Sequence, residues 1–124
     1  MILRGTVVQG LGIGRMLGYP TANIAYDGES PGAGVYAARC SIDGVVYDAV
    51  AVVGARVHSG KPLVEVLMFD FSGDLYGKEL EVKVFDKISE IEKFKNKRAL
   101  VRKIEDDIKK ARVCLQELSK RPGA

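Results

Sequence analysis

Glu65 is the residue whose setting in this sequence most strongly suggests chemistry. It interrupts an apolar run over residues 63–69 that has the length and composition of a buried strand. Alternation along that strand makes both of its faces apolar. A carboxylate there must be paired or stand at a cleft, because a lone buried charge is costly. Two interpretations stay open: a general base, or a structural ion pair with Arg39 or Arg56.

A glycine-rich stretch, Gly10-x-Gly12-x-Gly14, follows the first apolar run. Backbone N–H groups that no side chain covers can approach phosphate oxygens closely, and Arg15 could neutralise phosphate charge. A Rossmann fold needs a helix directly after such glycines. Gly18 and Pro20 come too soon for that helix. The stretch is therefore either a phosphate-binding loop or an ordinary turn.

Thr21 and Asn23 follow this loop and are two residues apart. In an extended chain their side chains point to the same side. Neutral, hard oxygens of this kind suit Mg²⁺, which proteins usually hold with few ligands together with the phosphates of a nucleotide. Taken alone, the pair is better explained as an ordinary Thr and Asn in a turn.

Composition excludes several classes of protein. The chain has 124 residues, which fits one domain, and no apolar run long enough to span a membrane. The N-terminus lacks the pattern of a signal peptide, so we expect a cytoplasmic protein. His58 is the single histidine and no C-x-x-C is present, which argues against a zinc site. Cys40 and Cys114 are expected to be reduced packing residues.

The charge is uneven along the chain. Residues 89–124 carry eleven Lys and Arg against six Asp and Glu, within a formal net charge of +3. This excess could favour an anionic ligand or a nucleic acid. It is also typical of a solvated helix face, because acidic residues interrupt the basic ones.

Hydrophobic periodicity predicts strands followed by one helix. Apolar or alternating runs occupy residues 3–9, 21–26, 35–42, 45–53, 63–71 and 78–84. Asp43-Gly44 predicts a tight hairpin, whereas residues 54–62 are expected to form a loop. A helical face follows, with Asn96 as its N-cap: Leu100, Ile104, Ile108, Ala111, Leu115 and Leu118. Strands followed by a single helix indicate an antiparallel barrel with a helix packed against it.

Four segments in this order resemble the riboflavin kinase family. They are residues 14–24, residues 31–37, residues 64–66 with 70–78, and Phe94 with the terminal helix. The resemblance implies a mainly β fold, a closed six-stranded antiparallel Greek-key barrel with a C-terminal α-helix. One domain would span residues 1–124, with the barrel at about 1–88 and the helical segment at about 90–121.

The same resemblance implies roles for individual residues. ATP would donate its γ-phosphate to the ribityl 5′-hydroxyl of riboflavin, giving FMN and ADP, with CTP as donor left open. Glu65 would be the catalytic base. Thr21 and Asn23 would bind the metal, Mg²⁺ by default, with Zn²⁺ or Mn²⁺ left open. The nucleotide would contact Gly10, Gly12, Gly14, Arg15, Gly18, Pro20 and Tyr76. The flavin would contact Ser89, Glu92 and Phe94. We expect a monomer without nucleic-acid or membrane partners.

The chain departs from the family at the flavin side. Ser89 replaces a common Arg, Glu92 stands where some members have Lys, and Leu67 occupies a position often filled by His. The loop at residues 55–61 is also shorter than usual. These departures motivate an alternative, a non-catalytic flavin-binding or flavin-sensing module with the same barrel. A small nucleic-acid-binding barrel is a third possibility, but the chain lacks the interleaved aromatic residues on which bases stack.

Overall fold

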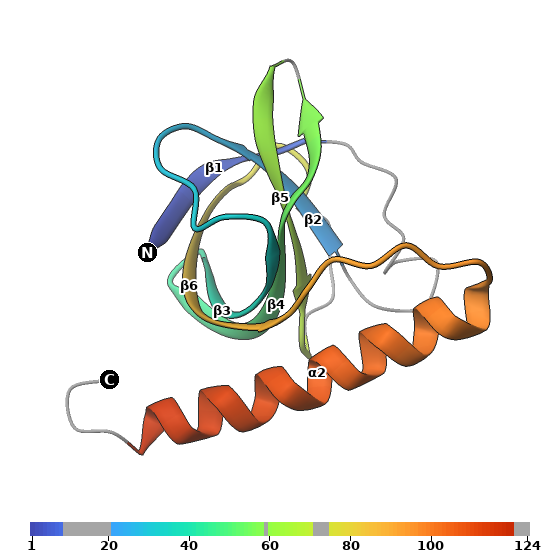
Figure 1. The fold of residues 1–124 in the computed structure, drawn as a ribbon. Helices are drawn as coiled ribbons and strands as arrows, with labels where there is room; N and C mark the ends of the chain where they lie inside the picture. Colours follow the sequence, from blue (N-terminus) through green and yellow to red (C-terminus); the bar gives the residue numbers. More distant parts are fainter. Residues whose placement is uncertain (9–20, 59, 71–74, 121–124) are drawn as a thin grey trace.

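The computed structural model describes residues 1–8, 21–58, 60–70 and 75–120, without the side chains of residues 55–58. Six strands and one long helix make up this part of the chain (Figure 1). The strands are β1 (Ile2–Val8), β2 (Thr21–Tyr26), β3 (Gly34–Ile42), β4 (Val45–His58), β5 (Lys61–Met68) and β6 (Glu79–Ser89). The helix is α2 (Lys97–Ser119).

The six strands close into a barrel in the order β1-β2-β5-β4-β3-β6, and every neighbouring pair is antiparallel. Strands β3, β4 and β5 follow one another around the wall, and β6 returns to lie beside β3. That order defines a Greek key. The mainly β barrel with a C-terminal helix, predicted from the sequence, is confirmed.

The hairpin between β3 and β4 is the one that the sequence predicted. Asp43 and Gly44 both adopt positive φ, 49° and 82°. A two-residue turn of this kind matches the twist of the flanking strands. The ladder then runs without a break from Ile42 opposite Val45 to Gly34 opposite Val53.

The predicted loop at residues 54–62 is wrong. Strand β4 continues to His58 and pairs with β5, which begins at Lys61. The register shifts between Val53 and Arg56, and Gly54 adopts a φ of +87°. Glycine at such an irregularity bends the strand without ending it. Strand β6 likewise continues past its predicted end at Val84 to Ser89.

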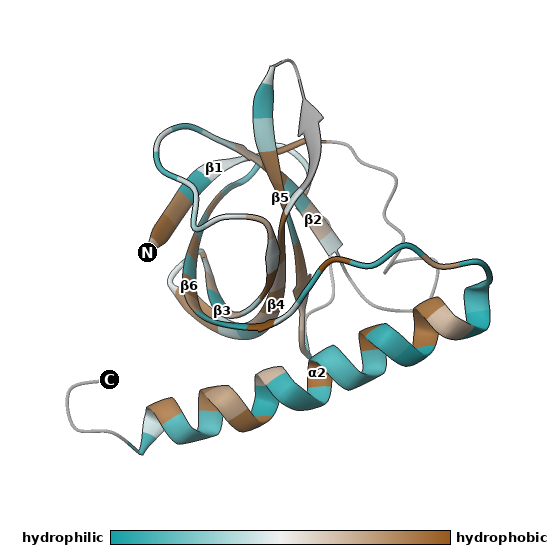
Figure 2. Cartoon of the chain, viewed as in Figure 1, coloured by the Kyte–Doolittle hydropathy of each residue, from teal (hydrophilic) through white to brown (hydrophobic). Residues whose placement is uncertain are grey.

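Two apolar clusters stabilise the fold. The first fills the barrel interior, with members from all six strands. The second lies between the outer wall of the barrel and α2, along which hydrophobic and hydrophilic residues alternate in Figure 2. Its buried members are Val35, Ala37, Val50, Leu67, Phe69, Ile108, Ala111 and Leu115. The predicted helical face is therefore confirmed as the packing face.

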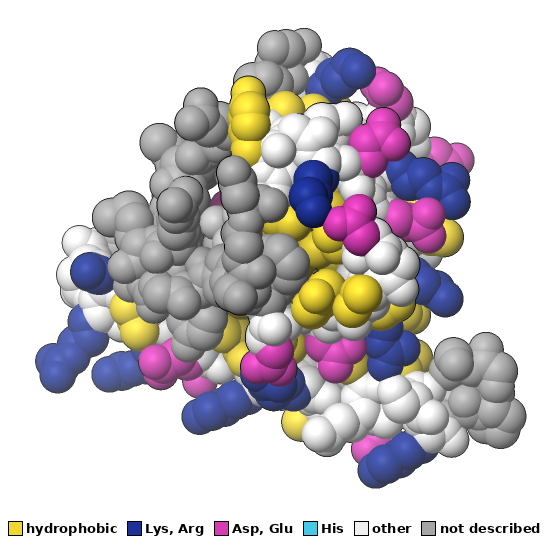
Figure 3. Space-filling model, turned by 180° about the vertical axis from the view of Figure 1, so that it is seen from behind, with side chains coloured by type: hydrophobic (Ala, Val, Ile, Leu, Met, Phe, Trp, Pro, Cys, Tyr) yellow, Lys and Arg dark blue, Asp and Glu magenta, His cyan; other side chains and the backbone are white. Residues whose placement is uncertain are grey.

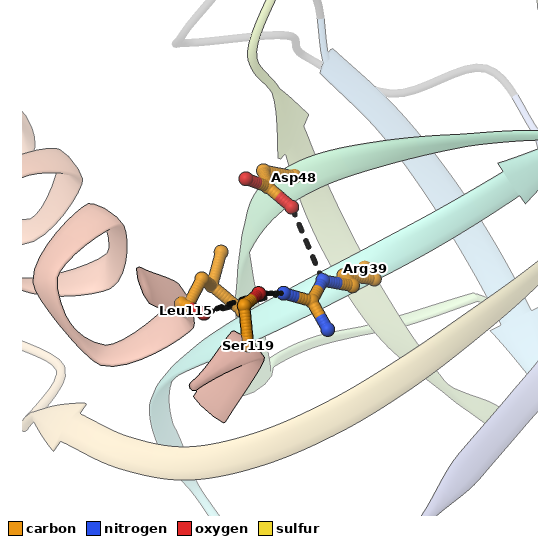
Figure 4. A network of polar contacts seen from close by, with 4 residues as sticks. All are labelled: Arg39, Asp48, Leu115 and Ser119. Atoms are coloured by element: carbon orange, nitrogen blue, oxygen red, sulfur yellow. Dashed lines mark hydrogen bonds and ion pairs between the residues drawn. The ribbon is translucent and has the colours of Figure 1, made fainter. Parts of the chain in front are cut away.

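Polar contacts fix both ends of α2. The Asn96 side chain accepts a hydrogen bond from the Ala99 N–H at 2.9 Å, as predicted for an N-cap. At the other end, Arg39 of β3 donates to the Leu115 carbonyl at 3.2 Å and to Ser119 Oγ at 2.8 Å (Figure 4). Arg39 also pairs with Asp48 at 3.2 Å. One arginine thus joins the last turns of the helix to β3 and β4.

The start of α2 is strongly basic. Lys and Arg side chains project at this end of the helix in Figure 3, which views the molecule from behind. Five exposed basic residues lie in the first two turns of α2 or just before it: Lys93, Lys95, Lys97, Arg98 and Arg102. Among the described residues, no helix combines the length and the apolar character that crossing a membrane requires.

Candidate functional site

Glu65 points away from the barrel interior. Its neighbours along β5, Val64 and Val66, are fully buried in the interior cluster. Alternation along a strand therefore turns Glu65 to the outer face. Arg39, one of the two partners considered for a structural ion pair, binds Asp48 instead. The Arg56 side chain lies outside the described residues.

Asn23 stands on the same outer face as Glu65. The two residues are directly opposite each other in the β2–β5 ladder, and opposed residues of an antiparallel pair share a face. Thr21, opposite Leu67, shares that face as well. The sheet register thus brings together the three residues predicted as base and metal ligands.

The Asn23 side chain carries a buried oxygen atom. The residue is only 4% exposed, and within the described part of the chain its Oδ1 atom is buried without a hydrogen-bond partner. Such an atom is unusual, because buried polar groups are nearly always paired. A neutral amide oxygen is a ligand that Mg²⁺ accepts. Asn23, with the half-buried Thr21 beside it, fits a divalent cation.

A pocket of about 180 Å³ opens on this face, between the barrel wall and α2. Its walls are mostly apolar. The barrel supplies Val35, Val50, Val52 and Leu67, the helix supplies Leu100, Ile104 and Ile108, and the connecting segment supplies Ile91 and Phe94. Its charged lining residues are Glu65, Glu90, Glu92, Lys103 and Asp107. An apolar cavity with a few polar groups is the usual form of a small-molecule site.

Three polar side chains meet at this pocket. Lys103 Nζ lies 2.6 Å from both Ser89 Oγ and Asp107 Oδ2, and Ser89 Oγ donates to Asp107 Oδ1 at 2.8 Å. Sequence reasoning did not assign a role to Lys103 or Asp107. One signal was available, because Asp107 lies between Ile104 and Ile108 on the apolar helix face, where a carboxylate is unexpected.

The other predicted site residues have different positions. Glu92 and Phe94 line the pocket. Ser89 is absent from its lining and instead holds two lining residues, Lys103 and Asp107. Tyr76 is 66% exposed and is not among the lining residues. The residues predicted for the glycine-rich loop lie outside the described part of the chain: Gly10, Gly12, Gly14, Arg15, Gly18 and Pro20.

Two of the three single-residue departures line this pocket, namely Leu67 and Glu92, and the third, Ser89, binds its lining. All three single-residue departures from the pattern that the chain resembles therefore lie at this pocket. A model of the family described as "Flavokinase: Riboflavin kinase" matches residues 1–115. The chain belongs to the riboflavin kinase family.

The curated relatives that the chain matches are longer than the chain. The chain is 34% identical over 110 residues to the RNA-binding riboflavin kinase RibR of Bacillus subtilis, covering 86% of this chain and 48% of that protein. Bacterial proteins named bifunctional riboflavin kinase/FMN adenylyltransferase are 31% and 37% identical, and the match covers 37% of their length. The chain therefore spans about half or less of the curated relatives that it matches.

Solved structures agree with this fold. The structure titled macrolide-efflux protein from Streptococcus pneumoniae superposes with a TM-score of 0.80 at 36% identity, over 90% of this chain and 38% of that one. Riboflavin kinase from Trypanosoma brucei gives a TM-score of 0.63 at 24% identity, over 99% of this chain and 90% of that one. The second comparison supports the fold alone.

Proposed function

We propose that this chain is a riboflavin kinase that transfers the γ-phosphate of ATP to the ribityl 5′-hydroxyl of riboflavin, giving FMN and ADP. One observation carries the proposal. Glu65 lines an apolar pocket and stands directly opposite Asn23, whose buried oxygen lacks a partner among the described residues. Phosphoryl transfer to a hydroxyl uses a base placed between the acceptor and the metal-bound nucleotide, and this arrangement suits that role.

The pocket would hold the isoalloxazine ring. Apolar side chains on opposite walls suit the two faces of a planar ring, and Phe94 adds an aromatic surface. The volume of about 180 Å³ is smaller than the ~300–1,000 Å³ typical of sites that enclose a whole ligand. A ring bound there would leave its ribityl chain extending toward Glu65 and β2.

Glu65 would act as the general base. The ribityl 5′-oxygen forms a bond to the γ-phosphorus while the bond from that phosphorus to the β,γ-bridging oxygen breaks. The hydroxyl proton passes to the Glu65 carboxylate, and ADP leaves. Positioning and electrostatic stabilisation supply most of the acceleration in such reactions, and a positioned base typically adds about 10²- to 10⁴-fold.

Thr21 and Asn23 would hold the divalent cation through their side-chain oxygens. Mg²⁺ is the expected ion, and Mn²⁺ or Zn²⁺ is compatible with the same atoms. When bound, the cation would neutralise charge on the transferring phosphoryl group. The nucleotide phosphates would lie against the glycine-rich loop with Arg15, and Tyr76 would stand near the nucleotide.

One assay tests the proposal. Purified protein is incubated with riboflavin, with ATP or CTP, and with Mg²⁺, Mn²⁺ or Zn²⁺ in turn, and FMN is followed by chromatography. We expect FMN with ATP and Mg²⁺. If folded protein binds riboflavin but makes no FMN with any donor or metal, the non-catalytic flavin-binding module replaces the kinase.

A further inference from the structure

The buried pair of Lys103 and Asp107 is the feature of the pocket that needs a separate explanation. The side chains are only 15% and 8% exposed, and their charged atoms lie 2.6 Å apart. Removing two charges from water costs several kcal/mol per ion before their attraction offsets that cost. Apolar side chains at these positions would continue the stripe formed by Ile104 and Ile108. Helix packing alone therefore does not account for the pair.

Helix propensity does not account for the pair either. Lys103 and Asp107 are four residues apart on α2, with the lysine toward the N-terminus of the helix. That orientation is the weaker one for an i,i+4 pair, because it opposes the helix dipole. The arrangement is thus unfavourable in two respects and stands at a ligand pocket, where such costs are commonly linked to function.

Lys103 keeps one donor for a ligand. An ammonium group has three N–H donors. Ser89 and Asp107 accept two of them, and within the described residues no protein atom accepts the third. Lys103 also lines the pocket. Two fixed contacts restrict the ammonium group to one position, which is how a polar group is made selective.

The charge of the pocket indicates which ligand this donor serves. Four carboxylates line the cavity and Lys103 is its one basic lining residue among those described: Glu65, Glu90, Glu92 and Asp107 are the acids. Glu90 is partly neutralised by Lys87 at 2.6 Å. Asp107 is paired with Lys103. Glu92 has no ion pair among the described residues and would repel an anionic ligand. A neutral ring with carbonyl acceptors is not repelled, and the uncommitted donor can bind it.

We propose that Lys103 is a specificity-determining residue that donates a hydrogen bond to a carbonyl oxygen on the pyrimidine edge of the flavin ring, with Ser89 and Asp107 as the residues that position it. This inference rests on the proposed function, because it takes the flavin as the ligand of the pocket. It assigns to α2 the recognition of the ring, while Glu65 on β5 serves the ribityl end.

The test uses riboflavin and lumiflavin, which has the ring without the ribityl chain, and measures binding by quenching of flavin fluorescence. Lys103→Met keeps the length of the side chain and removes the charge. Lys109→Met, at an exposed position of the same helix, is the matched control. A hydrogen bond to a charged group predicts that Lys103→Met weakens both ligands roughly 10- to 100-fold. Binding to Lys109→Met should equal that of the wild type.

Thio-analogues separate recognition from support of the fold. Riboflavin carrying sulfur in place of either ring carbonyl oxygen is a weaker acceptor. The wild type should bind one of the two analogues less tightly than riboflavin, and Lys103→Met should lose this discrimination. The double variant Lys103→Met/Asp107→Asn removes both charges together, so that neither is left buried alone, and should behave in the same way.

The outcomes distinguish this inference from the proposed function. Suppose that the wild type makes FMN, and that both Lys103 variants still bind riboflavin more tightly than the thio-analogue. Ring recognition by Lys103 is then refuted, and the proposed kinase activity is supported. If the preference for riboflavin over the thio-analogue depends on Lys103 but the wild type makes no FMN, ring recognition is supported and the proposed kinase activity is refuted. If the wild type binds neither flavin, both fail.

Discussion

Asn23 lies directly across the β2–β5 ladder from Glu65, so that the proposed metal ligand and the proposed base are neighbours on one face of the barrel wall. Opposed Cβ atoms in such a ladder are about 4.5–5.5 Å apart. Their separation is therefore set by sheet register. A slip of one residue would turn Glu65 into the barrel interior.

Glu65→Gln should lower kcat by about 10²- to 10⁴-fold, because the variant keeps the shape of the side chain and cannot accept the proton. The KM for ATP should change little, since the carboxylate is proposed to act on the hydroxyl. Steady-state kinetics of FMN formation check both values. Glu105→Gln, at an exposed position on α2, is the matched control. If the kcat of Glu65→Gln is close to that of the wild type, Glu65 is not the general base.

Asn23→Leu should separate metal binding from stability. The variant replaces a buried oxygen that has no partner among the described residues, so the free energy of unfolding should stay equal or rise by about 1 kcal/mol. The Mg²⁺ concentration for half-maximal activity should rise roughly tenfold or more, by analogy with the loss of one ligand or its support. Thermal unfolding and a Mg²⁺ titration test this. Lower stability with an unchanged metal requirement would make Asn23 a structural residue.

Arg39→Ala should loosen the end of α2, because Arg39 bonds to Leu115 and Ser119 of the helix and to Asp48 of β4. We expect the free energy of unfolding to fall by about 1–2 kcal/mol. Riboflavin affinity should fall too, since α2 forms one wall of the pocket. Arg4→Ala is the control: its ion pair with Glu81 is largely exposed and should contribute less than about 1 kcal/mol. If chemical denaturation shows equal losses of unfolding free energy for the two variants, Arg39 does not hold the end of α2 in the way proposed.

Cys40 should be unreactive toward thiol reagents in the folded protein. Burial raises the pKa of its thiol from 9.0 to about 11, and the thiolate is the reactive form. A thiol reagent at pH 8 should therefore modify Cys40 only after denaturation, which peptide mapping can check.

The same shift makes stability depend on pH. Between pH 9 and about 11 the unfolded thiol loses its proton while the folded one keeps it. The unfolded state then binds fewer protons, so stability falls as pH rises through this window. Cys40→Val should flatten that part of the curve, and an unaltered slope would show that other groups cause it.

Gly5→Ala should prevent normal closure of the barrel. A Cβ atom at Gly5 would lie 2.1 Å from the Ala25 carbonyl oxygen, and β1 is paired on both sides there, to Tyr26 and Leu80. Neither strand can move aside alone. Gly44→Ala is the comparison, because nothing surrounds its Cβ position and only its φ of +82° opposes the change, at a cost of about 1–2 kcal/mol. Comparable stability of the two variants would refute the steric argument.

Local patterns predicted most of the barrel and the start of the helix. Strand alternation, the Asp43-Gly44 turn and the Asn96 cap are encoded by neighbouring residues, and the structure confirms each of them. The predicted loop at residues 54–62 was wrong, because a glycine inside a long strand, such as Gly54, has the same local pattern as one in a loop.

Contacts between distant segments could not be predicted in this way. Glu65 was recognisable from its apolar neighbours, but its position opposite Asn23 depends on the β2–β5 register. The contact of Ser89 with Lys103 depends on how α2 docks against β6. Neither residue type nor spacing along the chain determines that docking.

Because side chains fill the barrel interior, the proposed ligand site lies in the seam between the barrel wall and the helix, and the two apolar clusters are largely independent of each other. Substitutions on the inward face of α2 can reshape one side of that seam without repacking the strands. Selectivity for the ring and the machinery for phosphoryl transfer can therefore evolve, or be engineered, on separate elements of the same small domain.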